Sequence, residues 1–182
     1  LSFLIIIVFW GAFEQAGGLM SLYTEQKTSR IISFSLPFIG NEIPAAVFQS
    51  INAFFIIILG TAVGGFWHKW KKKGKESSSL FKMAIGVIIM AFGFFFMSKA
   101  SSEVVMNGSE VAEKSAMIWL VLAYLFHTIG ELCASPVALS FITKLAPVKY
   151  ASFMMGSYFA ATGLGNKVAG WVGGLSENAG DF

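Results

Sequence analysis

Two glutamates within apolar segments are the residues of this sequence whose chemistry most needs an explanation. Glu131 lies near the middle of a long apolar run, and Glu14 lies within the sequence FWGAFEQAGG. A charged side chain inside a membrane is costly, so such residues usually face a bundle interior or a water-filled cavity. A carboxylate in that position can hold a cationic group or accept a proton. We therefore take Glu14 and Glu131 as the first candidates for functional residues.

A polar stripe surrounds Glu131 on the helix predicted for its segment. Tyr124, His127 and Thr128 precede it by seven, four and three residues, and Ser135 follows it by four. Side chains at these spacings share one face of an α-helix. We expect this face to turn toward a cavity. The alternative is a structural carboxylate that is neutral or ion-paired between helices.

Other polar residues in the apolar segments need partners as well. Glu14 has no basic residue in its own segment, and no basic residue of the other predicted spans is an obvious match for it apart from Lys167. Lys167 could pair inward or extend outward to the interface, and Glu14 could simply face a water-filled vestibule. Gln49 and Asn52 share a helix face, and amides inside a membrane often bond between helices.

The residue types argue against an enzyme, a metal site and a bound cofactor. His127 and Glu131 are too few ligands for a metal, and the lone Cys133 does not share their face. His127 and Ser135 lie about 12 Å apart along a helix, too far for a direct hydrogen bond. No glycine-rich phosphate loop follows a predicted strand. We expect no enzymatic activity and no bound cofactor.

The composition indicates the elements that must position these residues. The chain has 182 residues, of which 55% are hydrophobic and 13% charged, whereas soluble domains carry about a quarter charged residues. A helix needs roughly 20 apolar residues to cross the hydrocarbon core. The sequence therefore predicts an all-α, polytopic membrane bundle with five spans, at about residues 1–23, 45–67, 80–97, 117–145 and 150–175.

The basic residues predict the orientation of the bundle. Five of the 13 basic residues lie between Lys69 and Lys75, directly after an apolar segment, so a juxtamembrane loop explains them better than a nucleic-acid patch. Lys144 and Lys149 flank another loop. Because positively charged loops stay in the cytoplasm, we expect loops 68–79 and 144–149 to be cytoplasmic in a multi-pass protein of the cell (inner) membrane.

Glycine pairs and the chain's ends add two expectations. Gly60 with Gly64, and Gly170 with Gly174, form GxxxG patterns that allow helices to approach closely; we expect ordinary internal packing rather than a dimerisation face. The chain opens inside an apolar run, and five is an odd number of spans. Transporters with internal repeats usually pair six helices in each half, so we expect missing segments before and after this chain.

Four motifs resemble the proton-dependent oligopeptide transporter family of the major facilitator superfamily. FWGAFEQAGG (9–18) is similar to its seventh helix, and FQSINAFFIIILG (48–60) to its eighth. GELCASPVALSFITKLAP (130–147) resembles its tenth helix, and FMMGSYFAATGLGNKVAG (153–170) its eleventh. The motifs occur in the family's order across nearly the whole chain. The resemblance implies that residues 1–182 form an incomplete C-terminal half of a twelve-helix transporter.

The resemblance also implies roles for individual residues. Glu131 would hold the amino terminus of a bound peptide, assisted by the amide of Asn52. Trp10 would line the central cavity, and Ser135 would fall within the binding region. Glu14 would pair with an arginine of the first helix and help to control the outer gate.

The implied function is proton-coupled symport of di- and tripeptides by alternating access, with Glu14 and Glu131 in gating or proton coupling. The implied partners are the peptide, protons, the lipid bilayer and the missing N-terminal half, and no nucleic acid. Tyr158 is also implied as a substrate-binding residue. It stands where the family often has tryptophan, which puts the preference for peptide side chains in doubt. The open alternatives are a same-fold transporter of nitrate or another small solute, and a non-transporting membrane scaffold.

Overall fold

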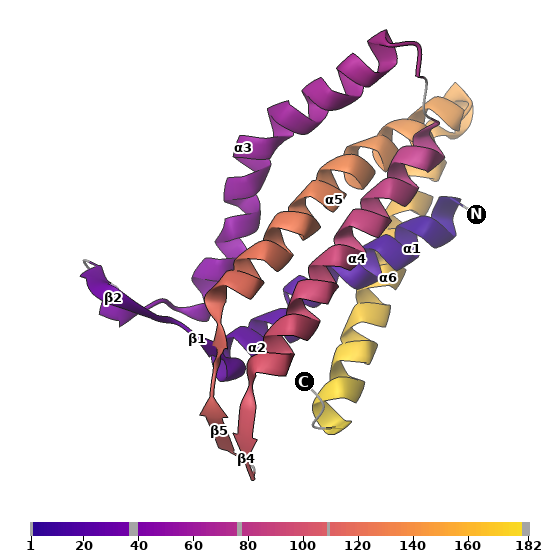
Figure 1. Cartoon of the computed structure of the whole chain (residues 1–182). Helices are drawn as coiled ribbons and strands as arrows, with labels where there is room; N and C mark the ends of the chain where they lie inside the picture. The colour runs from indigo at the N-terminus through magenta and orange to yellow at the C-terminus, as the bar shows by residue number, and fades with distance from the viewer. Residues whose placement is uncertain (1, 37–39, 76–77, 109, 180–182) are drawn as a thin grey trace.

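Long helices make up most of the chain in the computed structural model, which describes residues 2–36, 40–75, 78–108 and 110–179 (Figure 1). The helical elements are α1 (Ser2–Phe13), the 3-10 turn η1 (Glu14–Ala16), α2 (Leu19–Lys27), α3 (Ala45–Lys72), α4 (Ser79–Glu103), α5 (Met117–Leu145), the 3-10 turn η2 (Val148–Tyr150) and α6 (Ala151–Ala179). The strands are β1 (Thr28–Ser29), β2 (Ile31–Leu36), β3 (Gly40–Glu42), β4 (Val105–Asn107), β5 (Glu110–Glu113) and β6 (Ser115–Ala116).

The all-α fold class predicted from composition is confirmed. The described residues of the predicted apolar spans are mostly helical, because a helix satisfies its own backbone hydrogen bonds where no water is available. Four helical segments of the described residues are long and apolar enough to cross a membrane, namely Phe3–Lys27, Ala45–Lys72, Ser79–Glu103 and Met117–Lys144. The fifth predicted span forms the 29-residue helix α6, whose glycines and polar residues make it less apolar, so the count of five is approximate.

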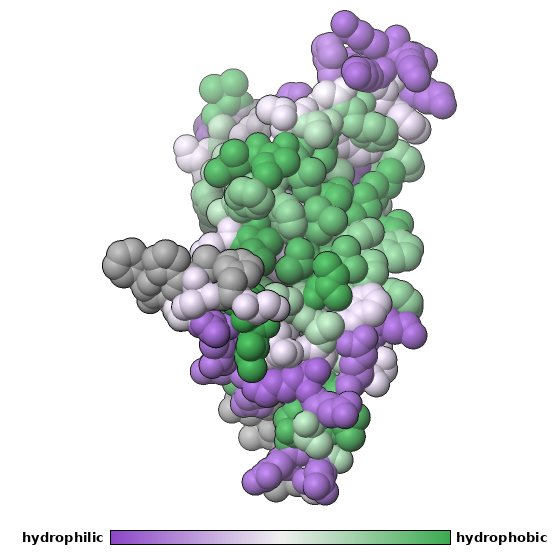
Figure 2. Space-filling model, turned by 60° about the vertical axis from the view of Figure 1, so that its left-hand side comes forward, coloured by the Kyte–Doolittle hydropathy of each residue, from purple (hydrophilic) through white to green (hydrophobic). Residues whose placement is uncertain are grey.

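The surface has the distribution of polarity that a membrane requires. Figure 2 shows a broad apolar band across the middle of one face, with hydrophilic residues gathered toward both ends. Large side chains such as Phe54, Ile57 and Phe92 are exposed in the described chain. Exposed side chains of this size are suited to contact with lipid or with another part of a larger protein.

The first predicted span is interrupted, which the sequence analysis did not anticipate. Helix α1 gives way to η1 at Glu14, and α2 starts only at Leu19. The amides of Gly17 and Gly18 both donate to the backbone oxygen of Glu14, at 3.1 and 3.2 Å. Consecutive glycines are a common cause of such interruptions, because they lack the side-chain contacts that favour a continuous helix. The interruption places Glu14 at a local change in backbone geometry.

Short strands occupy the loops at one end of the bundle, where none was predicted. Strand β1 pairs in parallel with β6, whereas β2 with β3 and β4 with β5 form antiparallel pairs. The hydroxyl of Tyr23 donates to Ser115 Oγ at 3.1 Å. The indole of Trp119 donates to the carboxylate of Glu103 at 2.7 Å. These contacts join the end of α2 and the end of α4 to the start of α5.

Glycines allow close approach of helices at places other than the predicted GxxxG pairs. A Cβ placed on Gly86 of α4 would lie 2.7 Å from the carbonyl oxygen of Gly130 of α5, so the two backbones are in contact. A Cβ on Gly165 of α6 would lie 2.7 Å from the carbonyl oxygen of Ile7 and 3.1 Å from the amide nitrogen of Gly11, both in α1. Among the glycines of the predicted GxxxG pairs, only Gly60 has a close neighbour in the described residues: a Cβ there would lie 4.0 Å from the side chain of Leu132 on α5. A Cβ at any of three of these glycines would have no neighbour within 4 Å: Gly64, Gly170 and Gly174.

Candidate functional site

A hydrogen bond between α3 and α5 joins the two polar residues that were expected to act together. The amide nitrogen of Asn52 donates to the Oε2 of Glu131 at 3.2 Å. Both side chains are half-buried, so the carboxylate is reachable while its orientation is fixed from the neighbouring helix. Hydrogen bonds to charged groups contribute about 1.5 to 3 kcal/mol. This pair therefore holds a carboxylate in a defined position within the bundle.

Thr128 completes the network around Asn52. Its hydroxyl is within hydrogen-bonding distance of the Asn52 side-chain oxygen and also of the backbone oxygen of Tyr124, at 2.8 Å. An amide side chain has a donor end and an acceptor end. When the Thr128 hydroxyl donates to the side-chain oxygen of Asn52, the side-chain nitrogen of Asn52 is directed at Glu131. Thr128 was expected only on the same helix face as Glu131, and its bond across to α3 is new information from the structure.

A small cavity of about 180 Å³ lies beside this network, between η1, α3 and α5. Its walls carry a carboxylate, two amide side chains, a phenol and an imidazole together with apolar groups. Such a mixture suits a small ligand that has a cationic amino group and hydrogen-bonding neighbours. The lining residues are Phe13, Glu14, Ala16, Gly17, Gln49, Asn52, Tyr124 and His127.

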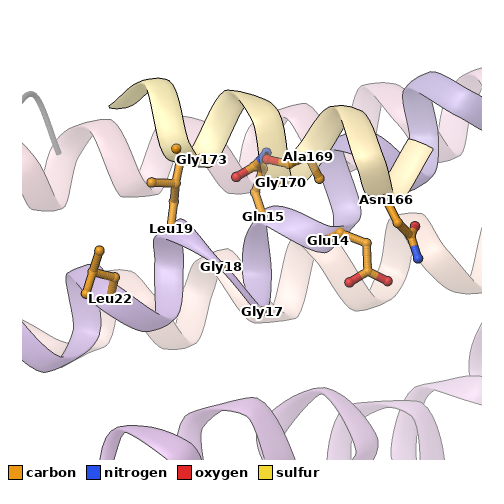
Figure 3. Close-up of a pocket in the computed structure, with 11 residues that line it drawn as sticks. Glu14, Gln15, Gly17, Gly18, Leu19, Leu22, Asn166, Ala169, Gly170 and Gly173 are labelled. Atoms are coloured by element: carbon orange, nitrogen blue, oxygen red, sulfur yellow. The ribbon is translucent and has the colours of Figure 1, made fainter. Parts of the chain in front are cut away.

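Glu14 borders a second and larger cavity as well. This space of about 490 Å³ lies between the α1–α2 interruption and α6. Figure 3 shows Glu14 and Asn166 at the same end of this cavity. Gln15 closes part of its wall, because its amide donates to the backbone oxygen of Ala169 at 3.1 Å. Among the described residues no basic side chain forms an ion pair with Glu14, and Lys167 is exposed on α6.

Trp10 and Ser135, the other two predicted binding residues, lie on different helices. Trp10 is half-buried on α1, in edge-to-face contact with Phe9 and Phe13, whose ring centroids lie 5.5 and 5.6 Å away. It packs one turn before Glu14, beside Gly165 of α6. Ser135 is half-buried on α5, one turn beyond Glu131.

Tyr158 lies apart from the Asn52–Glu131 pair. Its side chain is 4% exposed and belongs to an apolar cluster with Ile6, Met83, Ala138 and Ile142. This cluster joins α6 to α1, α4 and α5. The structure therefore places Tyr158 within helix packing, whereas Asn52 borders the smaller cavity and bonds to Glu131.

His127 faces partly away from the stripe to which its spacing assigned it. The ring is 1% exposed and packs 4.7 Å from the ring of Phe94 on α4, against Gly93. Both ring nitrogens lack a hydrogen-bond partner in the described part of the chain. No group of three or more His, Cys, Asp or Glu side chains capable of holding a metal was found there.

Asn166 is a cavity residue that the sequence analysis did not single out. It is exposed on α6 in the second cavity, close in sequence to the lysine that drew attention. A signal was available, since an amide within a predicted span needs a polar neighbour. Asn166 lies near Glu14 because α6 packs against α1. Residue spacing within a single segment does not reveal which helices pack together.

Comparison with known proteins identifies the group to which these features belong. A family model described as "POT family" matches residues 1–180. A protein of Yersinia enterocolitica subsp. palearctica named "Peptide transporter YePEPT" is 39% identical over 166 residues, which cover 91% of this chain and 31% of that protein. A "Di-/tripeptide transporter" of Lactococcus lactis subsp. lactis is 30% identical over 160 residues, covering 87% of this chain and 30% of that protein.

A solved structure has the same arrangement of helices. The crystal structure of "peptide transporter POT in complex with sulfate" matches with a TM-score of 0.75 and 30% identity, covering 94% of this chain and 31% of that one. This chain thus spans about a third of the length of the relatives that it matches.

Proposed function

The chain belongs to the POT family, and we propose that it forms the C-terminal part of a transporter that moves di- and tripeptides together with protons across a membrane. The family resemblance of the four sequence motifs is thereby confirmed, and its relatives are named as transporters rather than as enzymes. Their names and the polar network between α3 and α5 support the proposal. The chain would supply one side of a central cavity, and the rest of the protein the other side.

The observation that carries the proposal is the bond from Asn52 to Glu131. In the proposed role, the Glu131 carboxylate binds the ammonium group of a peptide, and the Asn52 side chain helps to hold that ammonium group. A carboxylate fixed by a neutral amide keeps its negative charge available, whereas a carboxylate paired with lysine or arginine would not. Charge-assisted hydrogen bonds to an ammonium are the stronger class of hydrogen bonds, which suits the one cationic group that every unmodified peptide shares.

Three further residues have proposed roles in substrate binding at the central cavity. Trp10 would line it from α1, and Ser135 would border it one turn beyond Glu131. Tyr158 would influence the peptide's side-chain preference through the packing of α1 and α5, which meet it in the apolar cluster.

Glu14 is the proposed gating and proton-coupling residue, together with Glu131. Its position at the α1–α2 interruption, between two cavities, supports a role at a point where helices move. The proposed partner is an arginine outside this chain. Protonation would remove one charge of such a pair, and breaking a buried pair costs about 3 to 5 kcal/mol. A membrane potential adds roughly 2.3 kcal/mol per charge per 100 mV, so protons could drive alternating access.

The proposed setting is the cell inner membrane, with loops 68–79 and 144–149 in the cytoplasm. The positions of the lysines support this orientation, because Lys144 at the end of α5 borders the same pocket as Lys71 in the last turn of α3 and Lys75 beyond it. The two basic loops thus lie at the same end of the bundle, as the positive-inside rule requires.

The substrate class can be tested by competition. The full-length protein that contains this chain would be placed in liposomes, and uptake of labelled di-alanine would be driven by an inwardly directed proton gradient. Unlabelled di- and tri-alanine should compete, whereas alanine and nitrate should not. If nitrate reduced the uptake and the unlabelled peptides did not, the substrate would be a different one. If no labelled di-alanine entered under any gradient, transport of peptides would be contradicted.

A further inference from the structure

A basic pocket lies at the lysine-rich end of the bundle, away from the Asn52–Glu131 network. It has a volume of about 510 Å³ and lies where α3 ends, α4 begins and α5 ends. Figure 2 shows a cluster of hydrophilic residues at the end of the molecule where α3 finishes. The pocket is lined by Trp67, Trp70, Lys71, Lys75, Ser78, Ser79, Lys82 and Lys144.

The charges around this pocket favour an anion. Four ammonium groups border it, and none of the described residues that line it is acidic. The 25-residue helix α4 begins there, with the Ser78 hydroxyl accepting a hydrogen bond from the amide of Phe81 at 3.1 Å. The remaining amides of the first turn and the positive end of the helix dipole add to the attraction for a negative group.

Two of the lysines are held in place by the tryptophans. The ammonium of Lys75 lies 4.9 Å from the ring centroid of Trp70, and that of Lys82 lies 5.1 Å from the ring centroid of Trp67. Cation–π contacts of this length restrain the side chain while leaving the ammonium hydrogens free to donate. The ammonium groups of Lys75 and Lys82 are therefore restrained beside the pocket by the two indole rings.

An apolar groove adjoins the basic pocket and shares Trp67 and Trp70 with it. The groove has a volume of about 420 Å³ and is walled by α3, α4 and α5. All its lining side chains are aliphatic or aromatic, apart from the thiol of Cys133. They are Ala62, Val63, Phe66, Trp67, Trp70, Phe81, Ile85, Ile89, Ile129 and Cys133.

We propose that the basic pocket and the apolar groove together bind one anionic phospholipid. The headgroup phosphate would lie among Lys75, Lys82 and Lys144, and an acyl chain would enter the groove past Trp67. Basic pockets between membrane helices on the cytoplasmic side are suited to acidic lipid headgroups. A free phosphate would leave the groove unfilled, and a zwitterionic lipid would bring its own cation into a pocket that is already positive. This inference rests on the membrane setting and is independent of the proposed peptide site.

The chain supplies a matched control for this proposal. Lys69, Lys72 and Lys73 are exposed at the end of α3 and do not border the pocket. They carry the same charge at the same end of the bundle, so they contribute to general attraction for an acidic membrane surface. Replacing them removes as much charge as replacing Lys75, Lys82 and Lys144 does. A difference between the two triple variants measures the pocket alone.

The test is native mass spectrometry of the full-length protein, titrated in detergent with phosphatidylglycerol or phosphatidylcholine. We expect phosphatidylglycerol to bind preferentially, and the triple variant Lys75→Gln/Lys82→Gln/Lys144→Gln to weaken that binding by about tenfold or more. The control triple variant Lys69→Gln/Lys72→Gln/Lys73→Gln should bind nearly as the parent does. Equal weakening in both variants, or equal binding of the two lipids, would overturn the proposal.

A second measurement tests the groove. Phosphatidylglycerol with brominated acyl chains should quench part of the tryptophan fluorescence at low lipid-to-protein ratios. The variant Ala62→Phe/Val63→Phe, which fills the groove without changing charge, should reduce that quenching. If inorganic phosphate displaces the lipid while the filled groove leaves quenching unchanged, the pocket is an anion site without an acyl chain and the proposal fails. Monodisperse elution of each variant establishes that it has folded.

Discussion

A threonine one turn from Glu131 sets the orientation of the amide that holds the carboxylate. Thr128 donates to the oxygen of Asn52, and Asn52 in turn donates to Glu131. The local chemistry of the site therefore depends on a chain of three side chains from two helices. Networks of this kind fix geometry more firmly than any single bond within them.

Removing the Thr128 hydroxyl should therefore weaken peptide binding without removing any charge. We expect Thr128→Val, which preserves the side-chain shape, to raise the KM for di-alanine by about fivefold, equivalent to the roughly 1 kcal/mol of one hydrogen bond. The measurement is concentration-dependent uptake into liposomes. Thr143→Val is the matched control, because Thr143 bonds only to backbone oxygens of its own helix. Similar KM values for the two variants would show that Thr128 does not orient the site.

The sequence was informative about which residues matter and less so about how they meet. Glu131 and Asn52 stood out because polar groups are costly in apolar helices, and the structure brings them into contact. His127 shares the predicted stripe, yet it packs against Gly93 and Phe94 of α4. A stripe on one helix covers a wide arc, and only the neighbouring helices decide which part of that arc faces the cavity.

Close backbone contact between α4 and α5 is the main feature at the scale of the elements. Gly86 and Gly130 face one another, and a Cβ on either would fall within 2.7 Å of the other's carbonyl oxygen. Helix α5, which carries Glu131, is thus positioned by a backbone contact that allows no side chain between the helices. The packing and the site are coupled through this one element.

A methyl group at that contact should destabilise the protein. Gly130→Ala would force the helices apart, and overpacking of this kind costs about 1 to 3 kcal/mol. The thermal unfolding temperature in detergent should fall by several degrees. A methyl group at Gly64 on α3 would have no neighbour within 4 Å among the described residues, so the unfolding temperature of Gly64→Ala should stay unchanged or rise slightly. An equal effect of both substitutions would contradict the contact.

Hydropathy predicted the helices that consist of long apolar runs. It missed the boundaries that depend on local backbone geometry. The spans at α3, α4 and α5 follow from long apolar runs. The interruption after Glu14 depends on two glycines, which a hydropathy window averages away. The strands of the loops are short. The pairing of β1 with β6 joins Thr28 to Ser115, far along the chain, whereas the other two pairs join consecutive strands. The helix contacts escaped prediction because single glycines, and not the GxxxG pairs, form them.

At the scale of the whole molecule, the lysine loops and the strand-bearing loops lie at opposite ends of an apolar bundle (Figures 1 and 2). This separation agrees with the proposed orientation. Single cysteines test it directly when they are introduced into a full-length protein from which the other cysteines, Cys133 included, have been replaced by serine. Lys73→Cys should react with a membrane-impermeant maleimide only from the cytoplasmic side, and Glu113→Cys only from the opposite side. Both positions are exposed, so the reverse pattern of labelling would overturn the orientation.

The central claim is that Glu131 binds the peptide's amino group in a proton-driven transporter. Its most direct test is uptake of labelled di-alanine by the full-length protein in liposomes under an imposed proton gradient, with Glu131→Gln and the exposed control Glu25→Gln alongside. The account predicts that uptake follows the gradient in the parent and the control, and that it falls at least tenfold in Glu131→Gln. Gradient-driven uptake that persists undiminished in Glu131→Gln, with an unchanged KM, would contradict it.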